Sequence, residues 1–208
     1  MCALKATSWV KGNRWLNDTE MKNNAEMVYK YFKRVGWSLN AISATLGNMQ
    51  VESTINPGIW ENLVVEAEGR GFGLVQWTPW TNYTNWADSK GYTWDDGSGQ
   101  CYWIAYETKN YGQWLNNEYI STAYPMTFDE FIVSTESPEY LADVFLRNFE
   151  RPADLNQPIR QTYARQWYNY LIELDGEPSP TPIPVPKRKR KPMFFNSKTI
   201  VYILKRRF

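Results

Sequence analysis

The sequence predicts a mainly α-helical (α+β) domain with a small β-hairpin, followed by a proline-rich linker and a basic tail. Apolar residues recur at three- and four-residue steps in several segments, as on one face of a helix. One stretch, residues 60–77, instead has β-branched and aromatic residues around glycines, which predicts a hairpin or ordered loop. With 208 residues, the chain is long enough for one sizeable core. We expect four parts: an N-terminal arm (1–17), the helical domain (18–176), the linker (177–186) and the basic segment (187–208).

Two helices begin the domain. Asp18 or Thr19 is a suitable cap for a first helix that ends at Gly36. A second helix is expected over residues 38–51. The first helix carries its apolar stripe at Met21, Ala25, Val28, Phe32 and Val35, and the second at Leu39, Ile42, Leu46 and Met49. One tight turn joins them, so we expect a helical hairpin.

Glu52 extends the apolar stripe of the second helix, three residues after Met49. Burial of a carboxylate is unfavourable unless the group is paired, hydrogen-bonded or functional. The simple reason is a hydrogen bond to turn amides or an ion pair with an arginine. The alternative is general acid catalysis, because desolvation keeps a carboxyl protonated and able to donate to a glycosidic oxygen.

Further helices follow from capping residues and helical spacing. Thr78-Pro79 predicts a helix through Ser89 that ends at Gly91. On it, Trp80, Tyr83 and Trp86 form one ridge, with Tyr83 a candidate for stacking on a ligand. The remaining predicted helices are residues 100–115, 127–133, 137–149 with Glu150-Arg151-Pro152 closing it, and 158–174, whose inward face is Ile159, Tyr163, Trp167, Tyr170, Leu171 and Leu174. Glu150 and Arg151 are most simply an ion pair or a loop clasp.

Composition excludes several chemistries. The chain has no histidine and two cysteines, Cys2 and Cys101, which we interpret as free thiols. The chain therefore lacks the metal ligands or the histidine base that zinc hydrolases, Cys-His amidases and Ser-His-Asp hydrolases require. The loop at residues 95–99 lacks the spacing of a calcium loop. We expect no metal and no cofactor, whereas a glycosidase needs only carboxylates.

Two blocks of sequence carry a family resemblance. GNMQVESTINPG surrounds Glu52, and GFGLVQWTP follows at residues 71–79. They resemble the Glu-Ser and Gly-Leu-Met-Gln blocks of the goose-lysozyme and lytic transglycosylase superfamily, and most closely the phage tail lysozymes of the phi29-type tail knob. A third block, residues 149–158, follows in the right order.

The resemblance implies a lysozyme-like fold in which Glu52 takes the place of the catalytic acid. It also implies substrate binding by Asn56, Gln76 and Trp77, which lie in the two blocks, while Tyr83 is a binding candidate from its place on the ridge. The loop at residues 64–70 carries Glu66 and Glu68 where no second family carboxylate aligns. These two are possible partners of Glu52, and the second catalytic role stays open.

The expected function is a muramidase that cleaves the β-1,4 bond between N-acetylmuramic acid and N-acetylglucosamine in bacterial peptidoglycan. Three alternatives remain: a lytic transglycosylase, a free lysin that acts at host lysis, and a non-catalytic wall-binding tail plug.

The tail is opposite in charge to the domain. Nine of the 23 Lys/Arg and none of the 22 Asp/Glu lie in residues 187–208, which leaves residues 1–186 with a net charge of −8. With its hexamer TIVYIL, this segment is expected to attach the enzyme to other phage tail proteins rather than to nucleic acid. No secretory signal and no membrane-spanning run is apparent in the sequence, so we expect location in the virion or, after delivery, in the host envelope.

Overall fold

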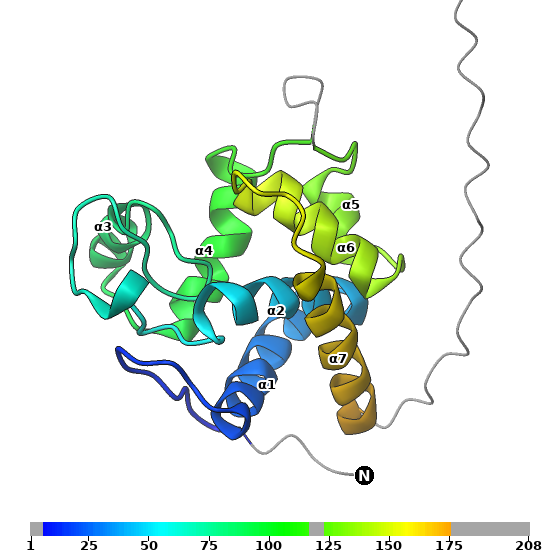
Figure 1. Ribbon diagram of the computed structural model, residues 1–208, viewed down its shortest axis with the longest axis horizontal. Helices are drawn as coiled ribbons and strands as arrows, with labels where there is room; N and C mark the ends of the chain where they lie inside the picture. The colour runs from blue at the N-terminus through cyan, green and yellow to red at the C-terminus, as the bar shows by residue number, and fades with distance from the viewer. Residues whose placement is uncertain (1–5, 117–122, 176–208) are drawn as a thin grey trace, which may run out of the picture.

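The computed structural model describes residues 6–116 and 123–175; the predicted linker, the basic segment and Cys2 lie outside this part of the chain. The described residues form a mainly helical domain, as predicted (Figure 1). Its seven α-helices are α1 (Asp18–Arg34), α2 (Leu39–Ser53), α3 (Thr81–Lys90), α4 (Gly97–Asn110), α5 (Phe128–Val133), α6 (Pro138–Phe145) and α7 (Pro158–Asp175).

Helix α2 is the centre of the fold. It crosses the middle of the molecule in Figure 1 and packs against α1, α5, α6 and α7. Ten of its fifteen residues are buried, so it lies inside the core rather than on it. Gly47 permits this, because a Cβ there would lie 2.5 Å from the Arg160 carbonyl oxygen and 2.7 Å from the Ala164 nitrogen of α7.

The first two helices were predicted to within a few residues. The cap of α1 is Asn17 rather than Asp18 or Thr19, because its side chain accepts from the Glu20 amide while Glu20 accepts from the Asn17 amide. Ser38 caps α2 by accepting from the Ala41 amide. Both helices thus begin with side-chain groups that satisfy otherwise unpaired amides.

Two helix starts differ from the prediction. Helix α3 begins at Thr81 rather than at Thr78-Pro79, because the Trp80 amide donates to Arg70 O (2.9 Å) and ties this segment to the preceding loop. Helix α4 begins at Gly97, earlier than Gln100, because Asp96 caps it by accepting from the Ser98 amide.

The expected β-hairpin at residues 60–77 is an ordered loop. The described residues contain only two isolated bridges, Trp60 with Phe72 and Phe72 with Trp77. Positive φ angles at Asn62, Leu63 and Glu66 turn the chain repeatedly, so no run is long enough to pair as strands. The loop lies beside α3, at the left of Figure 1.

The N-terminal arm is part of the domain. Val10 N and O both bond to the Asn24 side-chain amide of α1 (2.8 and 2.6 Å). The Asn56 amide donates to Gly12 O and Arg14 O (2.7 and 2.6 Å), and Trp9 packs on Gly97 at the start of α4. Three separate parts of the core therefore fix residues 6–16.

The inward face of α7 agrees with the prediction at Trp167 and Leu171, whereas Tyr163, Tyr170 and Leu174 are only partly buried. Ile159 is 44% exposed, whereas Arg160 is 3% exposed and begins a buried stripe that continues through Ala164, Trp167 and Leu171. The predicted stripe counted only apolar side chains, and the true one starts with a cation. None of the helices in residues 6–116 and 123–175 combines the length and apolarity needed to cross a bilayer.

Candidate active site

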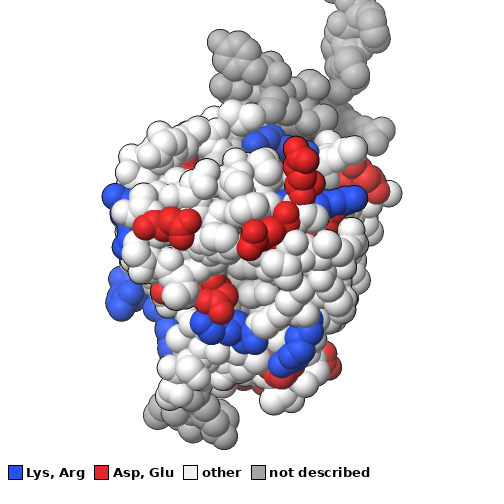
Figure 2. Space-filling model, turned by 90° about the vertical axis from the view of Figure 1, so that its left-hand side faces the viewer, with Lys and Arg blue, Asp and Glu red and all other residues white. Residues whose placement is uncertain are grey.

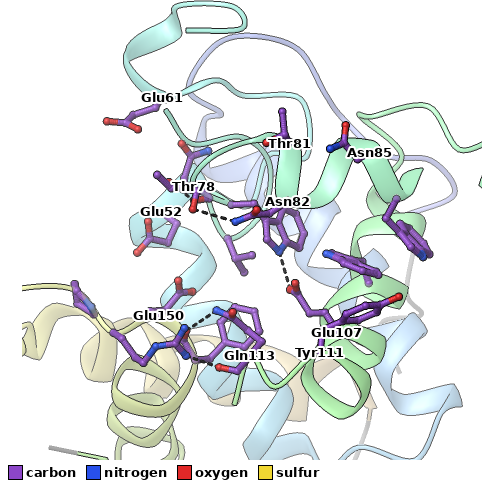
Figure 3. Close-up of a pocket in the computed structure, with 18 of the residues that line it drawn as sticks. Glu52, Glu61, Thr78, Thr81, Asn82, Asn85, Glu107, Tyr111, Gln113 and Glu150 are labelled. Atoms are coloured by element: carbon purple, nitrogen blue, oxygen red, sulfur yellow. Dashed lines mark hydrogen bonds between the residues drawn. The ribbon is translucent and has the colours of Figure 1, made fainter. Parts of the chain in front are cut away.

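A pocket of about 1050 Å³ lies between the C-terminal end of α2 and helix α3. The close-up in Figure 3 shows carboxyl groups of α2, α4 and the turn after α6 directed into it. Its lining comprises Trp15, Glu52, Glu61, Asn62, Val75, Gln76, Trp77, Thr78, Thr81, Asn82, Asn85, Trp86, Ser89, Trp103, Glu107, Tyr111, Gln113, Phe149, Glu150, Arg151 and Pro152.

Glu52 lies on one wall, in the last turn of α2. Helix α2 ends there because Thr54 adopts a left-handed conformation (φ 52°) as its C-cap. Ser53 is buried and donates to Met49 O (3.0 Å) and to Leu74 O (2.9 Å). The Glu-Ser pair is thereby joined to the second sequence block, and Glu52 is held at the pocket.

Arg160 binds Glu52 from α7. Its Nη2 donates to Glu52 Oε1 (2.5 Å), and its Nη1 donates to Asn48 Oδ1 (3.1 Å). The Arg160 side chain is 4% exposed and that of Glu52 is 22% exposed. Glu52 therefore combines the two reasons considered for it: it pairs with an arginine and still reaches the pocket.

Glu150 lies next to this ion pair. It ends a π-helical turn, η2 (Leu146–Glu150), which continues α6. Its Oε1 atom is buried and accepts no hydrogen bond from any described residue. Burial and the neighbouring Glu52 carboxylate raise the pKa of Glu150 well above its usual range, against the opposing effect of Arg160. We call Glu52, Glu150 and Arg160 the acid wall.

Arg151 does not pair with Glu150. Its guanidinium donates to the carbonyl oxygens of Gln113 and Asn148 instead. Two interpretations of Glu150-Arg151 were considered, an ion pair and a loop clasp. Arg151 acts as the loop clasp, and no salt bridge joins it to Glu150 among the described residues. Glu150 is thus left without a direct cationic partner.

Glu107 of α4 is a third buried carboxyl. It is 5% exposed and accepts from Trp77 Nε1 (2.7 Å). Burial raises the pKa of Glu107 to about 8, although the indole N–H groups of Trp77 and Trp103 oppose the shift. Glu107 is therefore a neutral acid over most of the physiological range.

Glu61, and not Glu66 or Glu68, brings another carboxylate to the pocket. Both Glu66 and Glu68 are exposed and neither contributes to the lining. Glu61 accepts from Arg70 Nη1 and from the Gly71 amide, each at 2.8 Å. Figure 3 places it beyond Glu52, on the loop. The repeated left-handed turns after Glu61 direct residues 66–68 outward.

The predicted binding residues divide into two groups. Gln76 and Trp77 line the pocket, and the Gln76 amide group is anchored by donating to Gly73 O (3.0 Å). Asn56 and Tyr83 do not line it. Asn56 is buried as the clamp of the N-terminal arm, and Tyr83 is buried beneath Trp77, with ring centroids 4.7 Å apart. Tyr83 in this structure thus supports the pocket from behind.

The opposite wall is polar and uncharged. Thr78, Thr81, Asn82, Asn85 and Ser89, which we call the polar wall, recur at three- and four-residue steps along α3 and the turn before it. Figure 2 views the α3 side of the molecule, where much of the surface is uncharged and acidic side chains lie across the middle. Two exposed aromatic rings, Trp15 (54%) and Tyr111 (68%), also line the pocket.

Sequence reasoning missed Arg160 and gave no role to Glu107. A signal was present for both. Arg160 starts a helical series with Ala164, Trp167 and Leu171, and Glu107 follows Trp103 and Ile104 on a buried face. The argument that identified Glu52, a charge on an apolar stripe, applies equally to these two residues.

The fold and the pocket define a lysozyme-like domain: a buried central helix ends in a glutamate that faces an open, carboxylate-lined pocket. The profile of the phage tail lysozyme family matches residues 23–171, and the chain belongs to this family. A similar protein is Morphogenesis protein 1 of Bacillus phage B103, which is 48% identical over 159 residues. The match covers 76% of this chain and 42% of the relative, so the chain spans about two fifths of that protein's length.

Proposed function

We propose that this protein is a muramidase that cleaves the β-1,4 bond between N-acetylmuramic acid and N-acetylglucosamine in bacterial peptidoglycan. The observation that carries the proposal is the position of Glu52, at the end of the buried α2 and on the wall of the pocket, in a member of the phage tail lysozyme family. Glu52 would protonate the leaving glycosidic oxygen as the C–O bond breaks.

The polar wall supports a carbohydrate substrate. Hydroxyl and amide side chains offer both donors and acceptors, which suits sugar hydroxyl and N-acetyl groups. Trp15 and Tyr111 present exposed ring faces at the pocket, where sugar C–H faces can stack. They take over the stacking role that the sequence suggested for Tyr83.

Glu61 is our candidate for the second carboxylate. Arg70 and the Gly71 amide each donate to one of its two oxygens, so the carboxyl group is held in one orientation at the pocket. A second carboxyl group across the cleaved bond from Glu52 would stabilise the oxocarbenium-like transition state or orient water.

The setting we propose is a phage tail, where the enzyme opens the cell wall locally as the phage penetrates its host. The family and the name of the B103 relative, a morphogenesis protein, support a place in the virion. Residues 187–208, with nine Lys/Arg and no acidic residue, would attach the domain to other tail proteins. Detection of the protein in purified virions tests this placement.

The Glu52→Gln variant tests the activity. Glutamine keeps the shape but cannot donate the proton, so turnover of purified cell walls is expected to fall by about 10²–10⁴-fold. Glu66→Gln is the matched control, because it removes the same charge from an exposed site outside the pocket. Full activity of the Glu52 variant would refute the assignment.

The released products decide the reaction type. Mass spectrometry separates a hydrolysed reducing end from a 1,6-anhydro sugar, which would identify a lytic transglycosylase instead. An inert wall-binding protein would bind peptidoglycan and release no new ends. A lysin that acts only at lysis would be absent from purified virions.

The role of Glu61 is tested separately. Glu61→Gln is expected to lower kcat at least about tenfold, whereas Glu66→Gln and Glu68→Gln should remain within about twofold of the wild type. Because Glu61 also holds the loop, thermal unfolding of the variant is measured in parallel. Equal activity of all three variants would leave Glu61 without a catalytic role.

A further inference from the structure

A cluster of aromatic rings begins in the pocket and continues onto the outer face of α4. We call this cluster the aromatic platform; it consists of Trp86, Tyr92, Tyr102, Trp103, Tyr106 and Tyr111. Trp86, Trp103 and Tyr111 line the pocket, whereas the other three rings lie outside the lining. The platform therefore extends the pocket onto the surface of the protein.

Two buried tryptophans form the base of the platform. The rings of Trp86 and Trp103 stack on each other, with centroids 4.6 Å apart and an interplanar angle of 27°. Each of the four tyrosines contacts one of these two rings, at centroid distances of 5.4–5.7 Å. The outer rings therefore rest on side chains that the core holds in place.

The tyrosines form the exposed part of the platform. Tyr102 and Tyr106 lie one turn apart on α4, with ring centroids 5.6 Å apart and an interplanar angle of 19°. Tyr106 lies 5.8 Å from Tyr111, the C-cap residue of α4. Tyr92, Tyr102 and Tyr111 are all exposed to solvent. Contiguous exposed apolar patches mark binding sites for ligands or partners more often than scattered apolar residues do.

The rings are already ordered by their packing. Tyr92 lies against Gly99 of α4, where a Cβ would be 3.0 Å from the Tyr92 ring, and the Tyr92 amide donates to Ala87 O (3.0 Å). Tyr102 stacks on Trp86 with an interplanar angle of 12°. A tyrosine has few torsions to fix, so a ring that is already packed loses little conformational entropy when a ligand binds.

The surroundings of the tyrosines favour a neutral ligand. Lys109 and Asn110 share the α4 face of Tyr106 by helical spacing. Lys109 pairs with Asp129 (2.7 Å), and the Asn110 amide donates to Tyr106 O (2.8 Å). Neither residue offers a free charge. Aromatic faces pack against C–H groups, and phenol hydroxyls both donate and accept hydrogen bonds, which suits a chain of sugar rings.

We propose that the aromatic platform is a second carbohydrate-binding surface, which holds the uncleaved part of a glycan strand while the adjoining part occupies the pocket. The inference rests on the proposed glycosidase function and extends it from the cleaved bond to the strand around it. It is carried by the pocket-lining rings that also contact the exposed tyrosines. Figure 3 shows Tyr111 on the side of the pocket away from Glu52, so a strand bound at Glu52 would cross the pocket to reach the platform.

The test compares ligands of two lengths, bound to the full chain carrying Glu52→Gln so that no strand is cleaved. Long peptide-free glycan strands can reach the platform, whereas the disaccharide of N-acetylglucosamine and N-acetylmuramic acid can occupy only the pocket. Replacing both Tyr102 and Tyr106 by alanine is expected to weaken binding of the long strand about tenfold and to change binding of the disaccharide by less than about twofold.

Tyr140→Ala is the matched control, because Tyr140 is similarly exposed but lies on α6, outside the pocket lining. It should leave both affinities unchanged. An equal loss for both ligands in the Tyr102 and Tyr106 variant would overturn the proposal, since the two rings would then only support the pocket. Unchanged binding of the long strand would also overturn it and would leave the platform to a protein partner.

A second measurement leaves the platform intact. Iodination of tyrosines in the Glu52→Gln protein is mapped by mass spectrometry with and without each ligand. The long strand is expected to protect Tyr102 and Tyr106, the disaccharide should protect neither, and Tyr140 is the internal reference. Equal reaction of Tyr102 and Tyr106 with and without the long strand would refute the proposal. If the wild-type protein released no new ends from cell walls, the proposed function would fail, whereas the protection would still show whether the platform binds glycan.

Discussion

The acid wall and the polar wall of the pocket differ in both charge and burial. Glu52, Glu150 and Arg160 come from three elements packed around the core, and Arg160 is almost completely buried. Asn82, Asn85 and Ser89 are exposed on α3, a helix that packs mainly against α4. Charge placed in a low-dielectric setting interacts strongly, whereas neutral groups at the surface can bind a ligand with little cost to the fold. Under the proposed function, the pocket would therefore separate proton transfer on one wall from sugar binding on the other.

The largest effect is expected from breaking the buried ion pair. Arg160→Met leaves Glu52 and Asn48 without their donor, and removing one partner of a buried pair costs about 3–5 kcal/mol. Arg165→Met is the matched control, because the Arg165–Glu139 pair is 41% and 34% exposed and should cost less than about 1 kcal/mol. Urea unfolding gives the free energy of unfolding of both variants. Equal losses would show that the Arg160–Glu52 pair contributes no more to stability than the exposed Arg165–Glu139 pair.

The next effect concerns the packing behind the acid wall. Gly47→Ala places a Cβ 2.5 Å from Arg160 O, a backbone atom that cannot rotate away, so α2 and α7 must separate. We expect a loss of about 2–3 kcal/mol in the free energy of unfolding, together with lower activity because Arg160 moves. The comparison is Ser89→Ala on the exposed α3, for which unfolding should change by less than about 0.5 kcal/mol. Unchanged stability of Gly47→Ala would show that the two helices adjust freely.

The raised pKa of Glu107, a third carboxyl in the pocket lining, is tested by the pH dependence of stability. Its pKa is raised to about 8, so the folded state binds a proton more tightly than the unfolded state does. Its contribution to stability is complete below the usual range of a glutamate and is lost as pH rises toward 8. Glu107→Gln removes this loss, and between pH 5 and 8 its stability should rise relative to the wild type by about 3 kcal/mol. Parallel stability curves for the two proteins would exclude the raised pKa.

The smallest effect is expected on the polar wall. Asn85→Ala removes one neutral hydrogen-bonding group, worth about 0.5–1.5 kcal/mol, from an exposed position in the lining. KM for soluble glycan fragments should rise about two- to tenfold while kcat and stability stay constant. Asp88→Ala, an exposed α3 residue outside the lining, serves as the control. A drop in kcat at constant KM would assign Asn85 to the chemistry instead.

The sequence was sufficient for the elements whose signals are local. Helix α2 and Glu52 followed from helical spacing and a stop signal, and Thr127 and Ser137 cap α5 and α6 at the starts predicted for residues 127–133 and 137–149. The partners of Glu52 were harder, because Arg160 lies 108 residues away and its choice of acceptor depends on how α2 and α7 pack. Periodicity likewise cannot tell that Trp77 covers Tyr83 or that the loop directs Glu66 outward.

The asparagine clamps on the N-terminal arm set a limit on how far the domain can be shortened. Asn24 and Asn56 are fully buried, and the side-chain amides of both donate to backbone carbonyls of residues 10–14; Asn24 also donates to Ile55 O. In a fragment that started at the first helix, the Asn56 amide would lose both of its acceptors, at a cost of about 1–3 kcal/mol, whereas the Asn24 amide would keep only its bond to Ile55 O. A shortened version of the domain should therefore retain the chain from about residue 6 onward.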